Sequence, residues 1–176
     1  MWTTLATNTL IMTEPKSPPM TTRQVALTTP AGFLAFGFGS GLAPKAPGTA
    51  GTVAALPLYL LIAHLPVLVY AAVVLIALLA GVWLCGRTAA DLGVHDHGGI
   101  VWDEFVGLWI ALFMVPLGWF WIVMGFVLFR LFDILKPWPI RWVDKRMGGG
   151  WGIMLDDVLA GIMAALCIQA ILVLIS

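Results

Sequence analysis

Long apolar runs, separated by short polar turns, occupy this chain from about residue 30 to its C-terminus. Their lengths predict an all-α integral membrane bundle with about five membrane segments. The apolar stretch from Thr49 to Gly86 must contain two helices with a turn at His64–Pro66, because one helix would extend roughly 57 Å, well beyond a bilayer core. The five predicted segments are Thr49–Ala63, Val67–Arg87, Ile100–Val115, Trp119–Leu135 and Val158–Ile175.

The stretch Pro30–Thr52 before the first segment is rich in glycine and is interrupted by Pro44 and Pro47. It is too broken for a spanning helix and too apolar for a free loop, so we expect a re-entrant or interfacial element. Residues 1–28 are rich in Thr, Pro and Ser, which predicts a mobile polar tail. Residues 29–176 then form a single membrane domain.

Composition supports the membrane prediction and adds an orientation. The chain is 61 % hydrophobic and 10 % charged, and its formal net charge of zero gives no basis for nucleic-acid binding. In the five-segment topology all nine Lys and Arg residues lie on or near one side of the membrane, while the turns at His64–Pro66 and Pro116–Gly118 contain none. The positive-inside rule makes the basic side cytoplasmic.

Acidic residues stand at the ends of the apolar segments, where a charge is costly unless something compensates it. The helix dipole could explain Asp103 and Glu104, but two adjacent carboxylates repel each other and favour a bound cation. An N-cap could explain one of Asp156 and Asp157 and leaves the other without a role. The candidate catalytic residues are Asp103, Glu104, Asp133, Asp156 and Asp157, and the candidate metal ligands are Asp103, Glu104, Asp133 and Asp157.

Basic residues near these acids suggest a site for a phosphate. Arg130 and Asp133 share a helix face at i, i+3, either as a simple ion pair or, since Arg130 lies inside the membrane boundary, as functional groups. The glycine-rich stretch resembles an anion cradle, although glycine also serves close helix packing. The candidate phosphate-binding residues are Lys45, Ser40, Thr49, Arg130 and Lys136, with Asp96 and His95 as secondary site candidates.

Four motifs, in this order, closely resemble the bacterial phosphatidylglycerophosphatase A family. They are GFGSGLAPKAPGT (Gly37–Thr49), GVHDHGGIVWDEFVG (Gly93–Gly107), FRLFDILKPWPI (Phe129–Ile140) and GIMLDDVLAG (Gly152–Gly161). The resemblance implies a Mg²⁺-dependent lipid phosphatase of the bacterial inner membrane. Such an enzyme converts the phospholipid phosphatidylglycerophosphate to phosphatidylglycerol and inorganic phosphate.

Two other functions and two mechanisms stay open at this point. A phosphatidyltransferase also uses Mg²⁺ and aspartates at the membrane edge, but it would need acids at regular helical spacing. A metal or proton transporter would need carboxylates near the middle of the membrane, whereas these gather at one surface. Within a phosphatase, either a water activated by the metal or a carboxylate that becomes an aspartyl-phosphate could attack the phosphorus.

Overall fold

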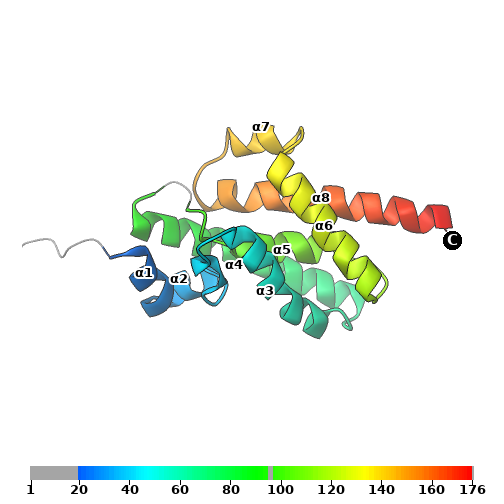
Figure 1. The fold of residues 1–176 in the computed structure, drawn as a ribbon, viewed down its shortest axis with the longest axis horizontal. Coiled ribbons are helices and arrows are strands. Elements are labelled where there is room, and N and C mark those ends of the chain that lie inside the picture. Colours follow the sequence, from blue (N-terminus) through cyan, green and yellow to red (C-terminus); the bar gives the residue numbers. More distant parts are fainter. Residues whose placement is uncertain (1–19, 95–96, 176) are drawn as a thin grey trace, which may run out of the picture.

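The computed structural model describes residues 20–94 and 97–175, and every regular element in these ranges is a helix. The all-α prediction is therefore confirmed. The elements in chain order are α1 (Thr22–Thr28), α2 (Pro30–Ala35), the short 3-10 helix η1 (Ser40–Leu42), α3 (Pro47–Ile62), α4 (Val67–Leu92), α5 (Trp102–Ala111), α6 (Trp119–Leu135), α7 (Ile140–Asp144) and α8 (Gly149–Ile175) (Figure 1).

The count of five membrane segments needs correction. By length and composition, α4 and α8 are the two described helices that could cross a membrane, and α3 is a shorter apolar helix. The predicted segment Ile100–Val115 contains only the ten residues of α5. Val101 N–H donates to the Ala35 carbonyl at 2.8 Å just before the helix, and Met114 has a left-handed φ of 56° just after its end. Since α5 is packed by α3, α4, α6 and α8, it is a core helix of the bundle.

Helix α8 begins at Gly149 rather than at the predicted Val158. The glycine run before the acids suggested a loop, but here it lets two backbones approach. A Cβ on Gly150 would collide with the carbonyl of Val82, and Gly86 of α4 lies against Gly150 as well. Close packing against α4 therefore outweighs the low helix propensity of glycine.

The other predicted helices agree well with the structure. The first two predicted segments form separate helices, α3 and α4, joined by the turn at His64–Pro66. Helix α6 has the predicted bounds. It starts directly after Gly118 and ends shortly before Pro137. Apolar run length and proline position thus predict these elements well.

Residues 22–28 form α1, so the prediction of a mobile tail is wrong for this stretch. Thr21 caps the helix in a reciprocal pair of hydrogen bonds with Gln24. Val25 and Ala26 are fully buried, and the helix packs on α2 and α4. The predicted tail up to residue 19 lies outside the described residues.

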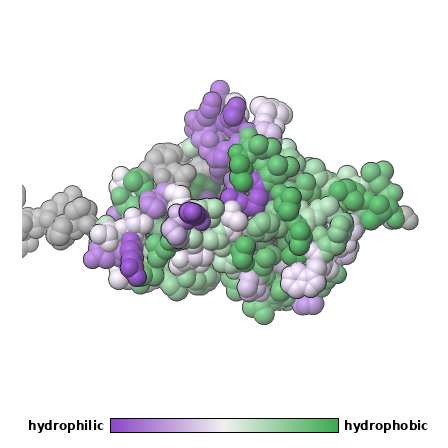
Figure 2. Space-filling view, in the orientation of Figure 1, coloured by the Kyte–Doolittle hydropathy of each residue, from purple (hydrophilic) through white to green (hydrophobic). Residues whose placement is uncertain are grey.

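The outer surface is unusually apolar. Leu68 of α4 and Leu174 of α8 are 84 % and 83 % exposed, and many other large apolar side chains are exposed on α3, α4, α6 and α8. Figure 2 shows hydrophobic residues over much of one half of this face, while hydrophilic ones gather around α7 and near α1. Such a surface suits contact with lipid.

The contact between α5 and α8 gives a stability prediction. Because a Cβ on Gly161 would collide with the Gly107 carbonyl and lie 3.1 Å from Ile110 Cβ, Gly161→Ala is expected to destabilise the fold by about 1–3 kcal/mol. Thermal unfolding in detergent, followed by circular dichroism, measures this as a lower melting temperature. Gly118→Ala is the control, since its Cβ would meet Trp121 at an ordinary 3.7 Å. Equal melting temperatures for the two variants would contradict the close α5–α8 contact.

Candidate active site

Three carboxylates from two helices meet inside the bundle. Asp103 and Glu104 lie in the first turn of α5, and Asp157 lies on α8. One oxygen from each of the three lies within 4.8 Å of the others. Glu104 and Asp157 are only 8 % and 3 % exposed. The structure thus brings together three of the four metal ligands proposed from the sequence.

The remaining two candidate acids lie next to this carboxylate cluster. Asp133 of α6 interacts electrostatically with both Glu104 and Asp157. Asp156 is buried on α8, and its Oδ1 accepts a hydrogen bond from the Asp157 N–H at 3.1 Å. All five predicted catalytic acids therefore share one region where α5, α6 and α8 meet.

The helix positions bear on the simpler explanations of these acids. Asp156 and Asp157 lie well inside α8, so helix capping explains neither of them. Asp103 and Glu104 do lie in the first turn of α5, where the helix dipole favours them. This dipole offsets part of the cost of their burial, but it does not account for the approach of Asp157 from another helix.

Arg130 of α6 reaches into the cluster with spare hydrogen-bonding capacity. Its Nη1 lies 2.6 Å from Asp133 Oδ2 and 3.5 Å from Glu104 Oε1, so the predicted i, i+3 pair exists and extends to α5. Neither contact has hydrogen-bond geometry, and the buried Nε and Nη1 have no hydrogen-bond partner among the described residues. The guanidinium therefore balances charge and keeps donors for another anion.

Lys136, at the end of α6, joins two acids. Its Nζ donates to Asp156 Oδ2 at 2.7 Å and to Asp144 Oδ1 of α7 at 2.8 Å. Burial alone would lower the pKa of Lys136, but these two hydrogen bonds and the negative charges outweigh it and raise the pKa. Lys136 is therefore a permanent cation. Sequence reasoning missed Asp144, since it lies among basic residues outside the apolar segments.

The charges do not balance within the chain. Five carboxylates (Asp103, Glu104, Asp133, Asp156 and Asp157) surround two cations, Arg130 and Lys136, and Oε2 of Glu104 is buried without a hydrogen-bond partner in the described ranges. A bound cation would remove this excess of negative charge. Since the atoms of the cluster that could coordinate a metal are carboxylate oxygens, the residues fit a hard divalent cation.

The start of α3 closes one side of the site. A Cβ on Gly48 would collide with Glu104 Oε1 and would lie 3.1 Å from Nη1 and Nη2 of Arg130. Gly48 is thus a site residue, which sequence reasoning treated only as part of the glycine-rich interfacial element and possible anion cradle. The half-buried Thr49 follows it in the same first turn, where helix N–H groups lack internal acceptors.

The other phosphate-binding candidates lie apart from the carboxylates in the described contacts. Ser40 uses its hydroxyl to donate to the Gly37 carbonyl at 2.8 Å, so it stabilises the local turn. Lys45 is exposed in the loop before α3. Their role in binding phosphate stays a prediction. His95 and Asp96, the secondary candidates, lie outside the described residues.

Apolar outer helices surround a buried cluster of acids beside an arginine whose Nε lacks a hydrogen-bond partner in the described ranges, a combination typical of an enzyme that acts on an anion. Comparison with known proteins makes this specific. The family model for phosphatidylglycerophosphatase A matches residues 33–172, and the chain belongs to this family of phosphatases. The resemblance of the four motifs is thereby confirmed.

Relatives match over most of the chain. Phosphatidylglycerophosphatase A of Escherichia coli K12 is 49 % identical over 86 % of this chain and 88 % of its own length. The protein of the same name from Haemophilus influenzae is 50 % identical over 85 % of this chain and 93 % of its own length. A Bacteroides thetaiotaomicron protein, provisionally named a phosphatidylinositol-3-phosphatase, is 41 % identical over 75 % of this chain and 87 % of its own. No solved structure matches the chain.

Proposed function

We propose that this protein is a Mg²⁺-dependent phosphatase of phospholipid biosynthesis, which hydrolyses phosphatidylglycerophosphate at the cytoplasmic face of the bacterial inner membrane. Membership of the family and the names of two relatives support the substrate. The observation that carries the proposal is the group of Asp103, Glu104 and Asp157 oxygens within 4.8 Å of one another, beside the unfilled donors of Arg130.

Asp103, Glu104 and Asp157 are the residues that would hold the metal, with Asp133 at the edge of the group. Bound Mg²⁺ supplies Lewis-acid polarisation of the phosphate and a more acidic water. Glu104 has one oxygen near Arg130, and its other oxygen has no hydrogen-bond partner in the described ranges, so the same side chain can touch the cation and orient the guanidinium.

Arg130 is placed to bind the phosphoryl group through its Nε–H, which has no hydrogen-bond partner in the described ranges, while its Nη1 lies beside Asp133. The N–H groups in the first turn of α3, next to Gly48, offer further donors at a helix N-terminus. Lys136 stays protonated, so it adds positive charge and cannot act as a base. These groups stabilise the charge of the transferring phosphoryl.

Hydrolysis forms a bond from phosphorus to a water oxygen and breaks the bond from phosphorus to the glycerol oxygen. The attacking water must lose a proton, and the departing glycerol oxygen must gain one. Asp133 and Asp156, at the edge of the cluster, are carboxylates that can accept and return this proton. Attack by a carboxylate, followed by hydrolysis of an aspartyl-phosphate, would use the same donors for the phosphoryl oxygens.

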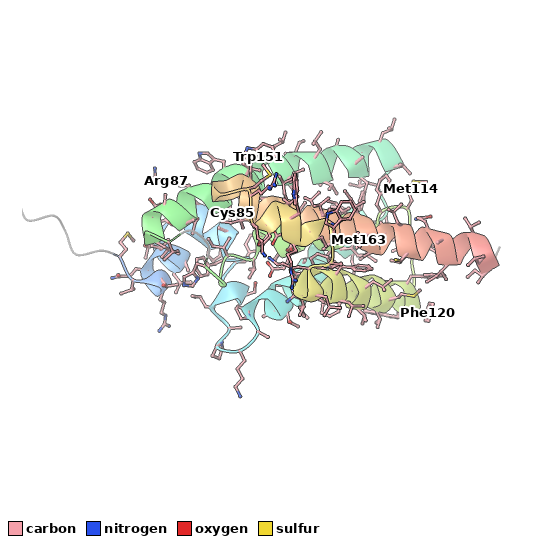
Figure 3. The ribbon with its side chains drawn as sticks, turned by 90° about the horizontal axis from the view of Figure 1, so that it is seen from above. Cys85, Arg87, Met114, Phe120, Trp151 and Met163 are labelled. Carbon is pink, nitrogen blue, oxygen red and sulfur yellow. The ribbon has the colours of Figure 1, made fainter. Side chains whose placement is uncertain are left out.

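The arrangement of the ends of the molecule supports the proposed orientation. Figure 3 places Arg87 towards one end and Met114 and Phe120 towards the other. The turn near the latter pair contains no basic residue, while Arg141 and Lys145 lie in the connection from α6 to α8, beside the carboxylate cluster. By the positive-inside rule, this distribution of basic residues supports a cytoplasmic position for the site.

Purified protein in detergent is expected to release inorganic phosphate from phosphatidylglycerophosphate and to leave phosphatidylglycerol. After dialysis against EDTA the rate should fall below about a tenth, and added Mg²⁺ should restore it, since uncompensated carboxylates would repel the substrate. Mass spectrometry identifies the lipid product, and a colorimetric assay measures phosphate.

Comparison substrates test the specificity. Phosphatidylinositol-3-phosphate is the alternative suggested by the name of the Bacteroides relative, and faster turnover of this lipid would reassign the substrate. Consumption of a CDP-lipid with release of CMP would indicate a phosphatidyltransferase. Cation uptake by protein-containing vesicles in the absence of any lipid phosphate would support a transporter. Full activity without any divalent cation would contradict the metal assignment.

A further inference from the structure

A groove with basic and indole side chains lies beside the proposed active site, at the junction of α6 and α7. It encloses about 430 Å³ and is lined by Leu135, Lys136, Pro137, Trp138, Arg141, Trp142 and Lys145. Its wall therefore combines three cations with two indole rings, and no carboxylate from the described residues lines it. This groove is separate from the carboxylate cluster but shares Lys136 with it, through the 2.7 Å contact to Asp156.

Arg141 and Lys145 are the cations of the groove that are available to a ligand, whereas Lys136 is held by Asp144 and Asp156. The only acid of α7, Asp144, points to Lys136 at 2.8 Å and is occupied there. Arg141 and Lys145 are exposed and form no ion pair with any residue in the described ranges. The groove is thus positively charged on the side where α7 faces the surroundings.

The apolar part of the groove faces out as well. Trp138 and Trp142 are 81 % and 50 % exposed, an uncommon state for indole rings on a surface that meets only water. Trp142 also has Arg146 over its ring, with Cζ 4.5 Å from the centroid. Tryptophan beside Lys and Arg is the composition of protein surfaces at the boundary between headgroups and acyl chains.

We propose that this groove binds the headgroup phosphodiester of an anionic diacyl phospholipid at the membrane surface. Arg141 and Lys145 contact the phosphodiester, and Trp138 and Trp142 contact the glycerol and the upper acyl chain. The proposal rests on the proposed membrane location of the protein, and the bound lipid is distinct from the substrate held at Arg130. Because Lys136 lines the groove and contacts Asp156, an anionic lipid there would lie beside the carboxylate cluster.

Native mass spectrometry of the full-length protein in neutral detergent tests the groove. Phosphatidylserine is the anionic probe, and phosphatidylcholine is the zwitterionic comparison. The wild type should retain phosphatidylserine preferentially. Arg141→Ala/Lys145→Ala should weaken this retention by about thirtyfold, since each basic residue near an anionic surface contributes about a factor of five.

Two further variants make the result specific. Arg23→Ala/Arg87→Ala removes the same charge from exposed positions on α1 and α4 and should leave phosphatidylserine retention unchanged. Arg141→Lys/Lys145→Arg should restore most of the retention. Equal loss in the two alanine pairs would show a diffuse charge effect and overturn the proposal, as would wild-type retention by Arg141→Ala/Lys145→Ala.

A competition experiment tests whether the groove binds a lipid or any free anion. Inorganic phosphate in tenfold excess over the lipid should not displace phosphatidylserine, because it cannot use the indole surface; full displacement would overturn the lipid assignment. The same preparations are assayed on phosphatidylglycerophosphate in neutral detergent. If Arg141→Ala/Lys145→Ala shows normal turnover and undiminished retention, only the lipid-binding proposal for the groove is overturned. If the wild type shows no turnover, the proposed function is overturned, and the retention result is unaffected.

Discussion

Replacing Asp157 by Asn is expected to lower turnover of the lipid phosphate by about three orders of magnitude. Asp157 is 3 % exposed and shares one space with Asp103 and Glu104. The amide keeps the shape of the side chain but removes a full charge from the group that would hold the cation, and an amide oxygen is the weaker ligand. The kcat at saturating Mg²⁺, and the Mg²⁺ concentration for half-maximal rate, measure the effect.

A stability measurement separates this role from a structural one. In the absence of metal, Asp157→Asn should unfold at or above the wild-type temperature, because it relieves repulsion from Glu104 and Asp133. Asp91→Asn, which alters only the surface pair with Arg87, is the control and should keep full activity. A fall in both activity and melting temperature of Asp157→Asn would mean that Asp157 supports the fold and not the chemistry.

The sequence predicted those helices whose ends are marked by proline and glycine. The bounds of α6 and the break between α3 and α4 follow from Gly118, Pro137 and Pro66, which act locally. The predictions were wrong at helix ends that are determined by tertiary contacts. The start of α8 depends on the approach of Gly150 to α4, and the start of α5 on the hydrogen bond from Val101 to Ala35. Neither contact is visible in a local pattern.

The site divides in the same way. The acids could be found because charge is rare in apolar runs and must have a reason there. The contact of Arg130 with Glu104, by contrast, joins α6 to α5 and could not be derived from spacing along one helix. The role of Gly48 was also hidden, since its lack of a side chain matters only once Glu104 and Arg130 are known to lie against it. Charged site residues can therefore be predicted from a sequence more readily than the glycines that make room for them.

Arg130→Lys is expected to lower kcat by about a hundredfold while keeping the fold, and Arg130→Gln to lower kcat by about a thousandfold and to destabilise it. Lysine keeps the charge between Glu104 and Asp133 but loses the planar fork with its unfilled Nε–H. Glutamine leaves the buried acids without their cation, and losing one partner of a buried pair costs about 3–5 kcal/mol. Steady-state rates and melting temperatures of both variants give the two quantities.

This pair of variants decides between the two explanations of Arg130. If the arginine only compensates Asp133 and Glu104, lysine is an adequate replacement and Arg130→Lys keeps nearly wild-type turnover. If the guanidinium binds the phosphoryl group, turnover falls although the melting temperature does not, and Arg130→Gln/Glu104→Gln recovers stability without recovering activity. The buried Arg130 Nε–H, without a hydrogen-bond partner in the described ranges, favours the second outcome, because leaving such a donor unsatisfied costs a purely structural ion pair about 1–3 kcal/mol. Its being left open is the expected state of an enzyme whose substrate completes the hydrogen bond.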